Sequence, residues 1–132
     1  MKFLLDTHIW LWSLLEPGRL TRRVARELTN PANELWLSPI SVWELLVLVR
    51  KGTVVLKEDS DAWIRKAMQA APLREATLTH EIALETREII LSHRDPADYF
   101  LAATAKVFGL TLITADGNLI RSRAVRVLAN RL

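Results

Sequence analysis

The stretch Phe3-Leu4-Leu5-Asp6, close to the N-terminus, decides the fold class. Its three apolar residues show no alternation with polar ones, which is typical of a strand buried on both faces within a parallel sheet. A helix is expected directly afterwards, over residues 8–15. In open α/β sheets, ligands bind beyond the carboxyl ends of the strands, so the Asp6 carboxylate is a candidate site residue. The alternative is that Asp6 only caps the following helix.

The composition is that of an ordinary globular protein. The chain has 132 residues, of which 50% are hydrophobic and 25% charged, and its formal net charge is +3. It contains no cysteine, which excludes disulfides and thiolate metal sites. No apolar run approaches the roughly 18 residues of a membrane span, and the N-terminus does not resemble a signal peptide. We therefore expect one domain over residues 1–132, located in the cytoplasm and independent of membranes.

Further strands and helices alternate along the chain. Strands are predicted at 34–38, 74–78, 110–114 and 125–128, with a short extended piece at 53–56. Helices are predicted at 21–28, 41–52, 60–71, 79–90 and 95–109, with a short one after residue 116. In the helix after Thr79, an inward stripe is expected to include Ile82, Ala83, Ile89 and Ile90. This alternation predicts a three-layer α/β/α fold with a mostly parallel, four- to five-stranded sheet.

Four acidic residues share one position in this predicted topology. Asp6 ends the first strand, Glu44 is in the first turn after the second, Asp98 opens the helix that leads to the fourth, and Asp116 ends the fourth. If these strands are neighbours, the carboxylates converge and raise each other's pKa. Few Lys or Arg residues adjoin them in sequence, so a divalent cation such as Mg²⁺ or Mn²⁺ is the natural counter-charge. The implied chemistry is phosphodiester hydrolysis.

Four short segments that contain these acids are similar to the motifs of PIN-domain ribonucleases, above all the VapC-type toxins. They are residues 4–8 (LLDTH), 38–44 (SPISVWE), 93–105 (HRDPADYFLAATA) and 112–116 (LITAD). Each is weak alone, but the four occur in order and at the family's spacing in a short chain. The resemblance therefore covers nearly the whole chain. One departure is Tyr99, where close relatives often carry Arg.

The resemblance implies a specific activity, a metal and partners. It implies an Mg²⁺- or Mn²⁺-dependent ribonuclease, in which Asp6, Glu44, Asp98 and Asp116 are the catalytic residues and metal ligands. It implies supporting hydroxyl groups from Thr7 and Thr114. It also implies an RNA substrate, a cognate antitoxin that neutralises the enzyme, and a homodimer.

Each candidate residue also has a structural interpretation. Ser41 and Glu44 have the spacing of a capping box, which would give both a purely local role. Asp95 could replace Asp98 as the ligand, although Asp95 is already expected to cap its helix. Asp116 could simply form a turn with the following glycine. His8, His80 and His93 are expected in surface or packing roles, with His8 the best candidate for a base.

The aromatic and basic residues are open to two interpretations. Tryptophans 10, 12, 36, 43 and 63 could stack on bases, but core or partner contacts are favoured. Two arginine-rich segments could contact phosphates or form solvated surfaces. They contain Arg19, Arg22, Arg23 and Arg26 in the first, and Arg121, Arg123, Arg126 and Arg131 in the second.

Two other functions fit a similar sheet. The first is an aspartate-based phosphatase or a receiver domain. Such a phosphatase usually has a second Asp two residues after its nucleophile, where this chain has His8, and a receiver needs an acidic pair after the first strand. The second is a catalytically silent protein-binding module, since fold alone does not establish activity.

Overall fold

The computed structural model describes residues 1–92 and 95–131 and centres on a five-stranded sheet. The strands are β1 (Lys2–Leu5), β2 (Glu34–Leu37), β3 (Arg74–Glu75), β4 (Thr111–Thr114) and β5 (Val127–Ala129). Their order is β3-β2-β1-β4-β5, and every neighbouring pair is parallel. The predicted fold class is confirmed, and the strands that precede Asp6 and Asp116 are adjacent.

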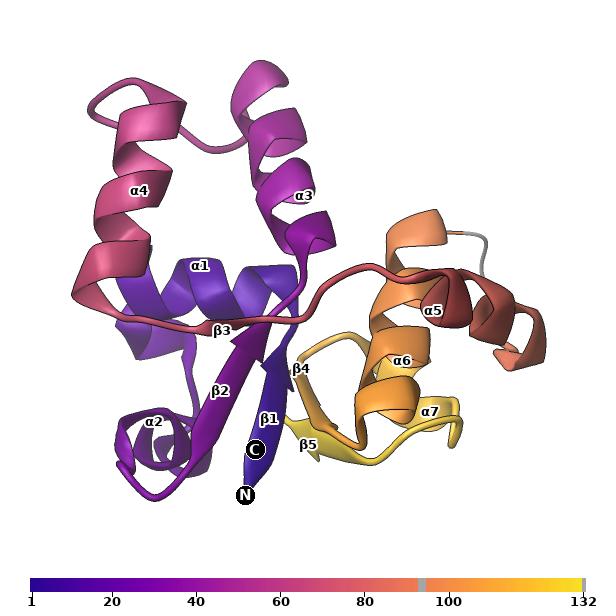
Figure 1. The fold of residues 1–132 in the computed structure, drawn as a ribbon. Helices are drawn as coiled ribbons and strands as arrows, with labels where there is room; N and C mark the ends of the chain where they lie inside the picture. Colours follow the sequence, from indigo (N-terminus) through magenta and orange to yellow (C-terminus); the bar gives the residue numbers. More distant parts are fainter. Residues whose placement is uncertain (93–94, 132) are drawn as a thin grey trace.

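Helices cover both faces of this sheet (Figure 1). The α-helices are α1 (Thr7–Leu15), α2 (Arg22–Thr29), α3 (Pro39–Arg50), α4 (Ser60–Ala70), α5 (His80–Glu85), α6 (Pro96–Phe108) and α7 (Gly117–Arg121). Short 3₁₀ turns occupy Pro17–Arg19 and Thr86–Glu88. Helices α1 to α4 gather on one side in Figure 1, and α5 to α7 on the other. None of the helices in the described part of the chain is long and apolar enough to cross a membrane.

The apolar run of β1 divides its side chains between two cores. Phe3 and Leu5 point into a cluster with residues of α1 to α4, whereas Leu4 packs with residues of α5, α6 and α7. All three side chains are at most 2% exposed. Successive side chains of a strand point to opposite faces of the sheet, so a strand covered on both faces is apolar at every position.

The helix that leads into β4 has the ends expected from its sequence. The Asp95 carboxylate accepts a hydrogen bond from the Ala97 N–H at 3.1 Å, and Pro96 is the first helical residue. Gly109 ends the helix in the left-handed conformation with φ = 66°, which is cheap only for a residue without a Cβ. These two ends fix where Asp98 lies relative to the sheet.

The capping prediction for α3 is wrong. The helix begins at Pro39 rather than Ser41, and its N-cap is Ser38, whose Oγ accepts the Ile40 N–H at 3.1 Å. Proline fits the first helical position because its missing N–H would have no partner there. Ser41 is therefore the third residue of the helix and fully buried, and Glu44, in the second turn, has no capping-box role.

Three smaller predictions also differ from the structure. Residues 53–56 form a bend and irregular structure instead of an extended strand. The third strand is limited to Arg74–Glu75, followed by one further hydrogen bond from the Ala76 N–H to the Leu37 carbonyl. In the helix after Thr79, Ile82 and Ile89 are buried, but Ala83 is exposed and Ile90 is 82% exposed. The α-helix ends at Glu85 and a 3₁₀ turn follows, so Ile90 does not continue a helical stripe.

Candidate active site

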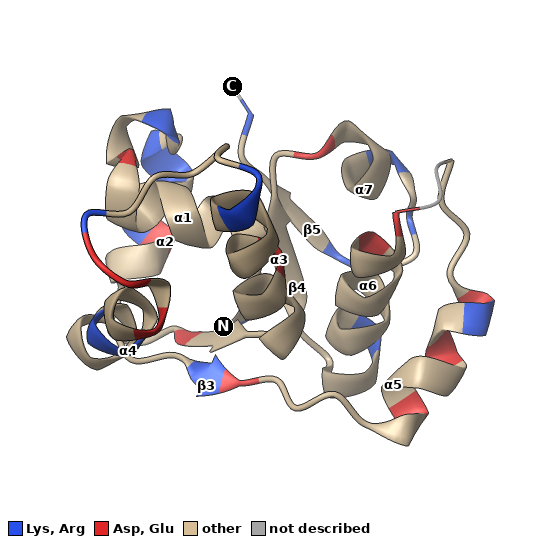
Figure 2. Cartoon of the chain, turned by 90° about the horizontal axis from the view of Figure 1, so that it is seen from above, with Lys and Arg blue, Asp and Glu red and all other residues tan. Residues whose placement is uncertain are grey.

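The four predicted acidic residues line one pocket at the carboxyl edge of the sheet. The pocket has a volume of about 380 Å³ and is lined by Asp6, His8, Trp12, Arg19, Glu44, Asp95, Asp98, Ala115 and Asp116. In Figure 2, acidic positions of α3, α6 and the turn before α7 surround the space between these elements. Parallel order brings these segments together, because the ends of β1 and β4 lie side by side.

Asp6 is the most completely held of the four. Its side chain is buried, with 7% of the residue exposed. One carboxylate oxygen accepts the Thr7 N–H at 2.7 Å, and the other accepts the Thr114 hydroxyl at 2.6 Å. Asp6 is thus the N-cap of α1 as well as a pocket residue, so the two interpretations of this residue are compatible. Thr114 belongs to β4, and its hydroxyl fixes the carboxylate across the two strands.

Glu44 is positioned by the first turn of α1. The Thr7 hydroxyl lies 2.5 Å from Glu44 Oε1 and 2.8 Å from the Ser41 hydroxyl. Thr7 and Ser41 are both buried, and their hydroxyl groups join α1 to α3 beneath the pocket. The sequence resemblance implied a supporting role for Thr7, whereas Ser41 was assigned to a cap. Its function in this network became visible only from the contact between the two helices.

The remaining acids approach from the other half of the sheet. Asp98 is 6% exposed and lies in the first turn of α6. Asp95 is exposed at the pocket rim and caps the same helix. Asp116 caps α7 by accepting the Asn118 N–H at 2.8 Å, and its own N–H donates to the Thr114 hydroxyl at 3.0 Å. Burial distinguishes Asp98 from Asp95, while both carboxylates border the same space.

Burial and mutual repulsion make the pocket unfavourable for negative charge. Desolvation raises the pKa of Asp6, against the lowering effect of its hydrogen bonds with Thr114 and Thr7. The nearby Asp116 raises it further. Desolvation also raises the pKa of Glu44, and the charges of Asp6 and Asp95 add to this effect. A bound cation would reverse the balance, because it stabilises the ionised carboxylates.

The carboxylate groups of the pocket suit a hard divalent cation, although they are not arranged around a single point as a closed metal site would be. Carboxylate oxygens are the ligands preferred by Mg²⁺ and Mn²⁺, and the described lining residues include no sulfur donor. Within residues 1–92 and 95–131, no three His, Asp or Glu side chains already form a closed metal site. Glu44 is turned toward Thr7, and Asp116 toward the backbone of α7. Mg²⁺ usually keeps several water ligands, so few direct protein ligands are needed.

One wall of the pocket carries a cation that the sequence pattern did not place there. The Arg19 guanidinium lies 4.2 Å from the centre of the Trp12 ring, and His8 lies against the same ring at 5.9 Å. Arg19 is 13 residues from Asp6 and was grouped only with the arginine-rich segment. The 3₁₀ turn after α1 returns the chain toward the pocket, which no local spacing rule indicates.

The other singled-out residues have diverse positions. Trp10 is buried and packs edge-on against Trp63, as expected for a core residue. Trp36 stacks on Phe108, and Trp43 is 55% exposed on α3. His80 begins α5, away from the acidic pocket. His93 and Arg94, from the third motif, lie outside the described residues.

Comparison with known proteins agrees with this fold. A model of the PIN domain matches residues 3–124, so the chain belongs to the PIN-domain family. It is 31% identical to the Ribonuclease VapC22 of Mycobacterium tuberculosis over 124 residues, covering 93% of each chain.

Solved structures share the same fold. One is the VapBC2 complex of Rickettsia felis bound to a DNA fragment from its promoter, with a TM-score of 0.71, 16% identity and 98% of both chains covered. Another is a toxin–antitoxin complex from Klebsiella pneumoniae, with a TM-score of 0.66, 21% identity and 97% of both chains covered. At these identities the likeness establishes the fold, while the activity has to be argued from the pocket.

Proposed function

We propose that the chain is a metal-dependent endoribonuclease toxin, neutralised by a cognate antitoxin. The observation that carries this proposal is the pocket in which Asp6, Glu44, Asp98 and Asp116 meet, together with Arg19 on the rim. The similarity to a VapC ribonuclease supports RNA as the substrate. We also propose that the enzyme acts in the cytoplasm, which cell fractionation would test, and that it is a homodimer, which light scattering on the purified chain would test.

In this proposal Asp6 and Asp98 hold Mg²⁺ or Mn²⁺, and Glu44 and Asp116 complete the site through their own oxygens or through water. The metal would activate a water molecule and neutralise charge on the phosphodiester. The Thr114 hydroxyl orients the Asp6 carboxylate, and the Thr7 hydroxyl orients Glu44. Arg19, whose guanidinium lies over the Trp12 ring and 3.7 Å from the Glu16 carboxylate, is placed to contact a nucleotide of the substrate.

Cleavage of a labelled RNA in the presence of Mg²⁺ or Mn²⁺ tests the assignment. We expect Asp6→Asn and Asp98→Asn to lower the cleavage rate by about 100-fold or more, because each removes a charged ligand from the site. Glu81→Gln is the matched control, since Glu81 is an exposed acid on α5 and should leave the rate unchanged. Undiminished cleavage by the Asp6 and Asp98 variants would refute the proposed site, and an inactive parent protein would favour a binding module.

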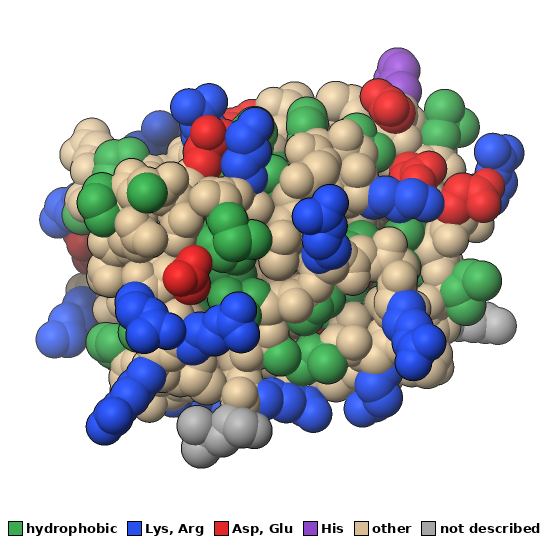
Figure 3. Space-filling view, turned by 90° about the horizontal axis from the view of Figure 1, so that it is seen from below, with side chains coloured by type: hydrophobic (Ala, Val, Ile, Leu, Met, Phe, Trp, Pro, Cys, Tyr) green, Lys and Arg blue, Asp and Glu red, His purple; other side chains and the backbone are tan. Residues whose placement is uncertain are grey.

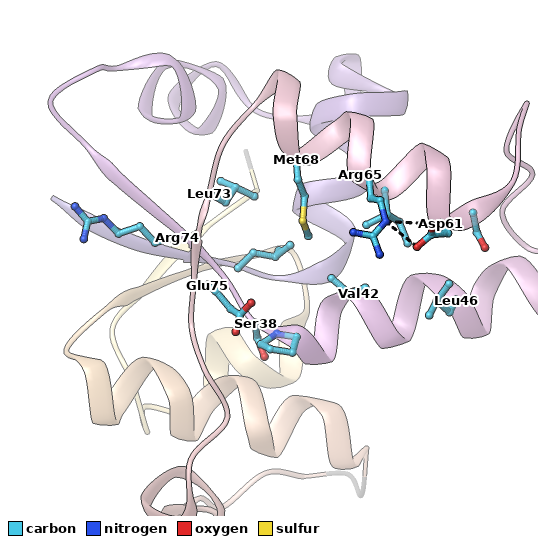
Figure 4. Close-up of a pocket in the computed structure, with 13 residues that line it drawn as sticks. Ser38, Val42, Leu46, Asp61, Arg65, Met68, Leu73, Arg74 and Glu75 are labelled. Atoms are coloured by element: carbon cyan, nitrogen blue, oxygen red, sulfur yellow. Dashed lines mark hydrogen bonds and ion pairs between the residues drawn. The ribbon is translucent and has the colours of Figure 1, made fainter.

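The proposed antitoxin has a suitable surface in a groove between α3 and α4. Figure 4 shows Val42 and Leu46 on α3, with Met68 and Arg65 of α4 on the opposite side of the groove and Leu73 at one end. The groove has a volume of about 530 Å³, and its rim carries the exposed pair Arg65–Asp61 at 3.0 Å. Leu46 and Met68 are 38% and 37% exposed. An apolar groove with a charged rim suits the apolar face of an amphipathic segment, and we assign this occupant to the antitoxin.

Co-purification of the chain with its antitoxin tests this assignment. Leu46→Glu places a charge in the groove and should abolish co-purification, whereas RNA cleavage should continue, because Leu46 is not part of the acidic pocket. Leu84→Glu is the control, because Leu84 is 65% exposed on α5 and outside the groove. Retention of the antitoxin by the Leu46 variant would exclude the groove as its docking site.

A further inference from the structure

Two arginines converge on one point beside the acidic pocket. Arg121 is in the last turn of α7, and Arg131 follows β5. A Cβ placed on Gly117 would lie 2.7 Å from Arg121 Nη1 and 2.9 Å from Arg131 Nη2. Both guanidinium groups therefore occupy the space directly over Gly117, where any other residue would place a side chain.

Neutral groups hold the two arginines in these positions. Arg131 donates from Nε and Nη2 to the Ala115 carbonyl at 3.4 and 3.3 Å, and Arg121 donates from Nη2 to Asn118 Oδ1 at 3.2 Å. Neither forms an ion pair with another residue of the described chain. Both side chains are exposed. Two like charges at this separation repel, so the arrangement favours an anion that both can contact.

The position relative to the pocket indicates which anion. Gly117 directly follows Asp116, and Ala115 and Asp116 both line the acidic pocket. Figure 2 shows the C-terminal end of the chain beside the turn that connects β4 to α7. In the opposite view, Lys and Arg are spread widely over the surface (Figure 3). The Arg121–Arg131 pair therefore shares with Arg19 a position next to the acids, and it lies beside the turn that contains Ala115 and Asp116.

We propose that Arg121 and Arg131 form a binding site for a backbone phosphate of the RNA, adjacent to the phosphate that is cleaved. This inference rests on the proposed function, in which RNA is the substrate. Guanidinium groups offer paired N–H donors that match phosphate oxygens. The missing side chain at Gly117 leaves room for both. The pair positions the RNA strand and takes no part in bond cleavage.

Binding of a fluorescein-labelled, single-stranded RNA 12-mer tests the site. The full chain with Asp6→Asn is used, so that cleavage does not obscure binding, and fluorescence anisotropy is measured over a range of salt concentrations. We expect Arg121→Gln and Arg131→Gln each to weaken binding about tenfold, the effect of losing one charge-assisted contact. Each should also reduce the slope of log K against log salt by about 1.

Two further variants separate this site from general charge effects. Arg26→Gln removes one exposed positive charge from α2, outside the acidic pocket and away from Gly117, and should change affinity far less. Gly117→Ala keeps every charge, and its φ is not in the left-handed region, so the chain should fold normally. Its Cβ would displace the flexible ends of both arginines, and we expect it to weaken RNA binding as much as one arginine substitution.

The outcomes distinguish this site from the proposed function. Equal RNA affinity of the Arg121, Arg131 and Arg26 variants would overturn the site, even if the parent protein cleaves RNA. Loss of antitoxin co-purification with unchanged RNA binding would also overturn it and assign the pair to the antitoxin. If the parent binds no RNA, the proposed function fails. In that case Tm is measured with and without inorganic phosphate. A phosphate-dependent rise in Tm for the parent but not for the Arg121→Gln variant would show that the arginine pair binds phosphate.

Discussion

Replacement of Asp6 by Asn should stabilise the metal-free protein and destroy its response to metal. The Asp and Asn side chains have the same shape, so the side-chain oxygen of the Asn can still accept the Thr7 N–H. The Thr114 hydroxyl donates to the Asp6 carboxylate in the parent, and in the variant it can accept a hydrogen bond from the new amide group instead. The substitution removes a charge from a site that is 7% exposed and close to Asp116. Without a cation, that charge lowers the stability of the fold.

The expected magnitudes have opposite signs under the two conditions. In EDTA the free energy of unfolding of the variant should exceed that of the parent by about 1 kcal/mol, which corresponds to about 3–5 °C in Tm for a chain of this length. At a metal concentration of 100 times Kd, binding stabilises the parent by about 2.7 kcal/mol, and the variant should gain little of this. The order of the two melting temperatures should therefore reverse when metal is added.

Thermal melts in EDTA and in increasing Mn²⁺, at fixed pH and ionic strength, measure both effects. Glu81→Gln serves again as the control, because loss of an exposed acid should leave the metal response intact. An equal rise in Tm with Mn²⁺ for the parent and the Asp6 variant would refute the view that Asp6 belongs to the metal site. A variant less stable than the parent in EDTA would show that the hydrogen bonds of Asp6 outweigh its buried charge.

Three further predictions concern the cap, the rim and the pH dependence. Ser38→Ala should lower the free energy of unfolding by about 0.5–2 kcal/mol in urea titrations, since α3 loses its N-cap. Arg19→Gln should raise KM for RNA several-fold with little change in kcat, if Arg19 on Trp12 binds the RNA without taking part in the cleavage step, as proposed above. Burial raises the pKa of Asp6 and Glu44, so their contribution to stability is full below about pH 4 and is lost as pH rises through the folded pKa values. In EDTA, the Tm advantage of Asp6→Asn should therefore grow from pH 4 to pH 8.

Local sequence signals predicted the elements whose ends are defined by neighbouring residues. Asp95, Pro96 and Gly109 bound α6 because a cap, a first-turn proline and a left-handed residue act within one or two positions. The same local reasoning was wrong at α3, where Ser38 and Ser41 were both suitable caps. The choice between them depended on Pro39 and on the contact of Ser41 with Thr7.

The sequence by itself determined the parallel α/β fold and the common position of Asp6, Glu44, Asp98 and Asp116. Strand periodicity and the end of each strand are written in short stretches of residues, and parallel strands align those ends. Only the tertiary structure decided which other side chains reach that position. Contacts between residues far apart in the chain follow from packing, and packing depends on all the elements at once.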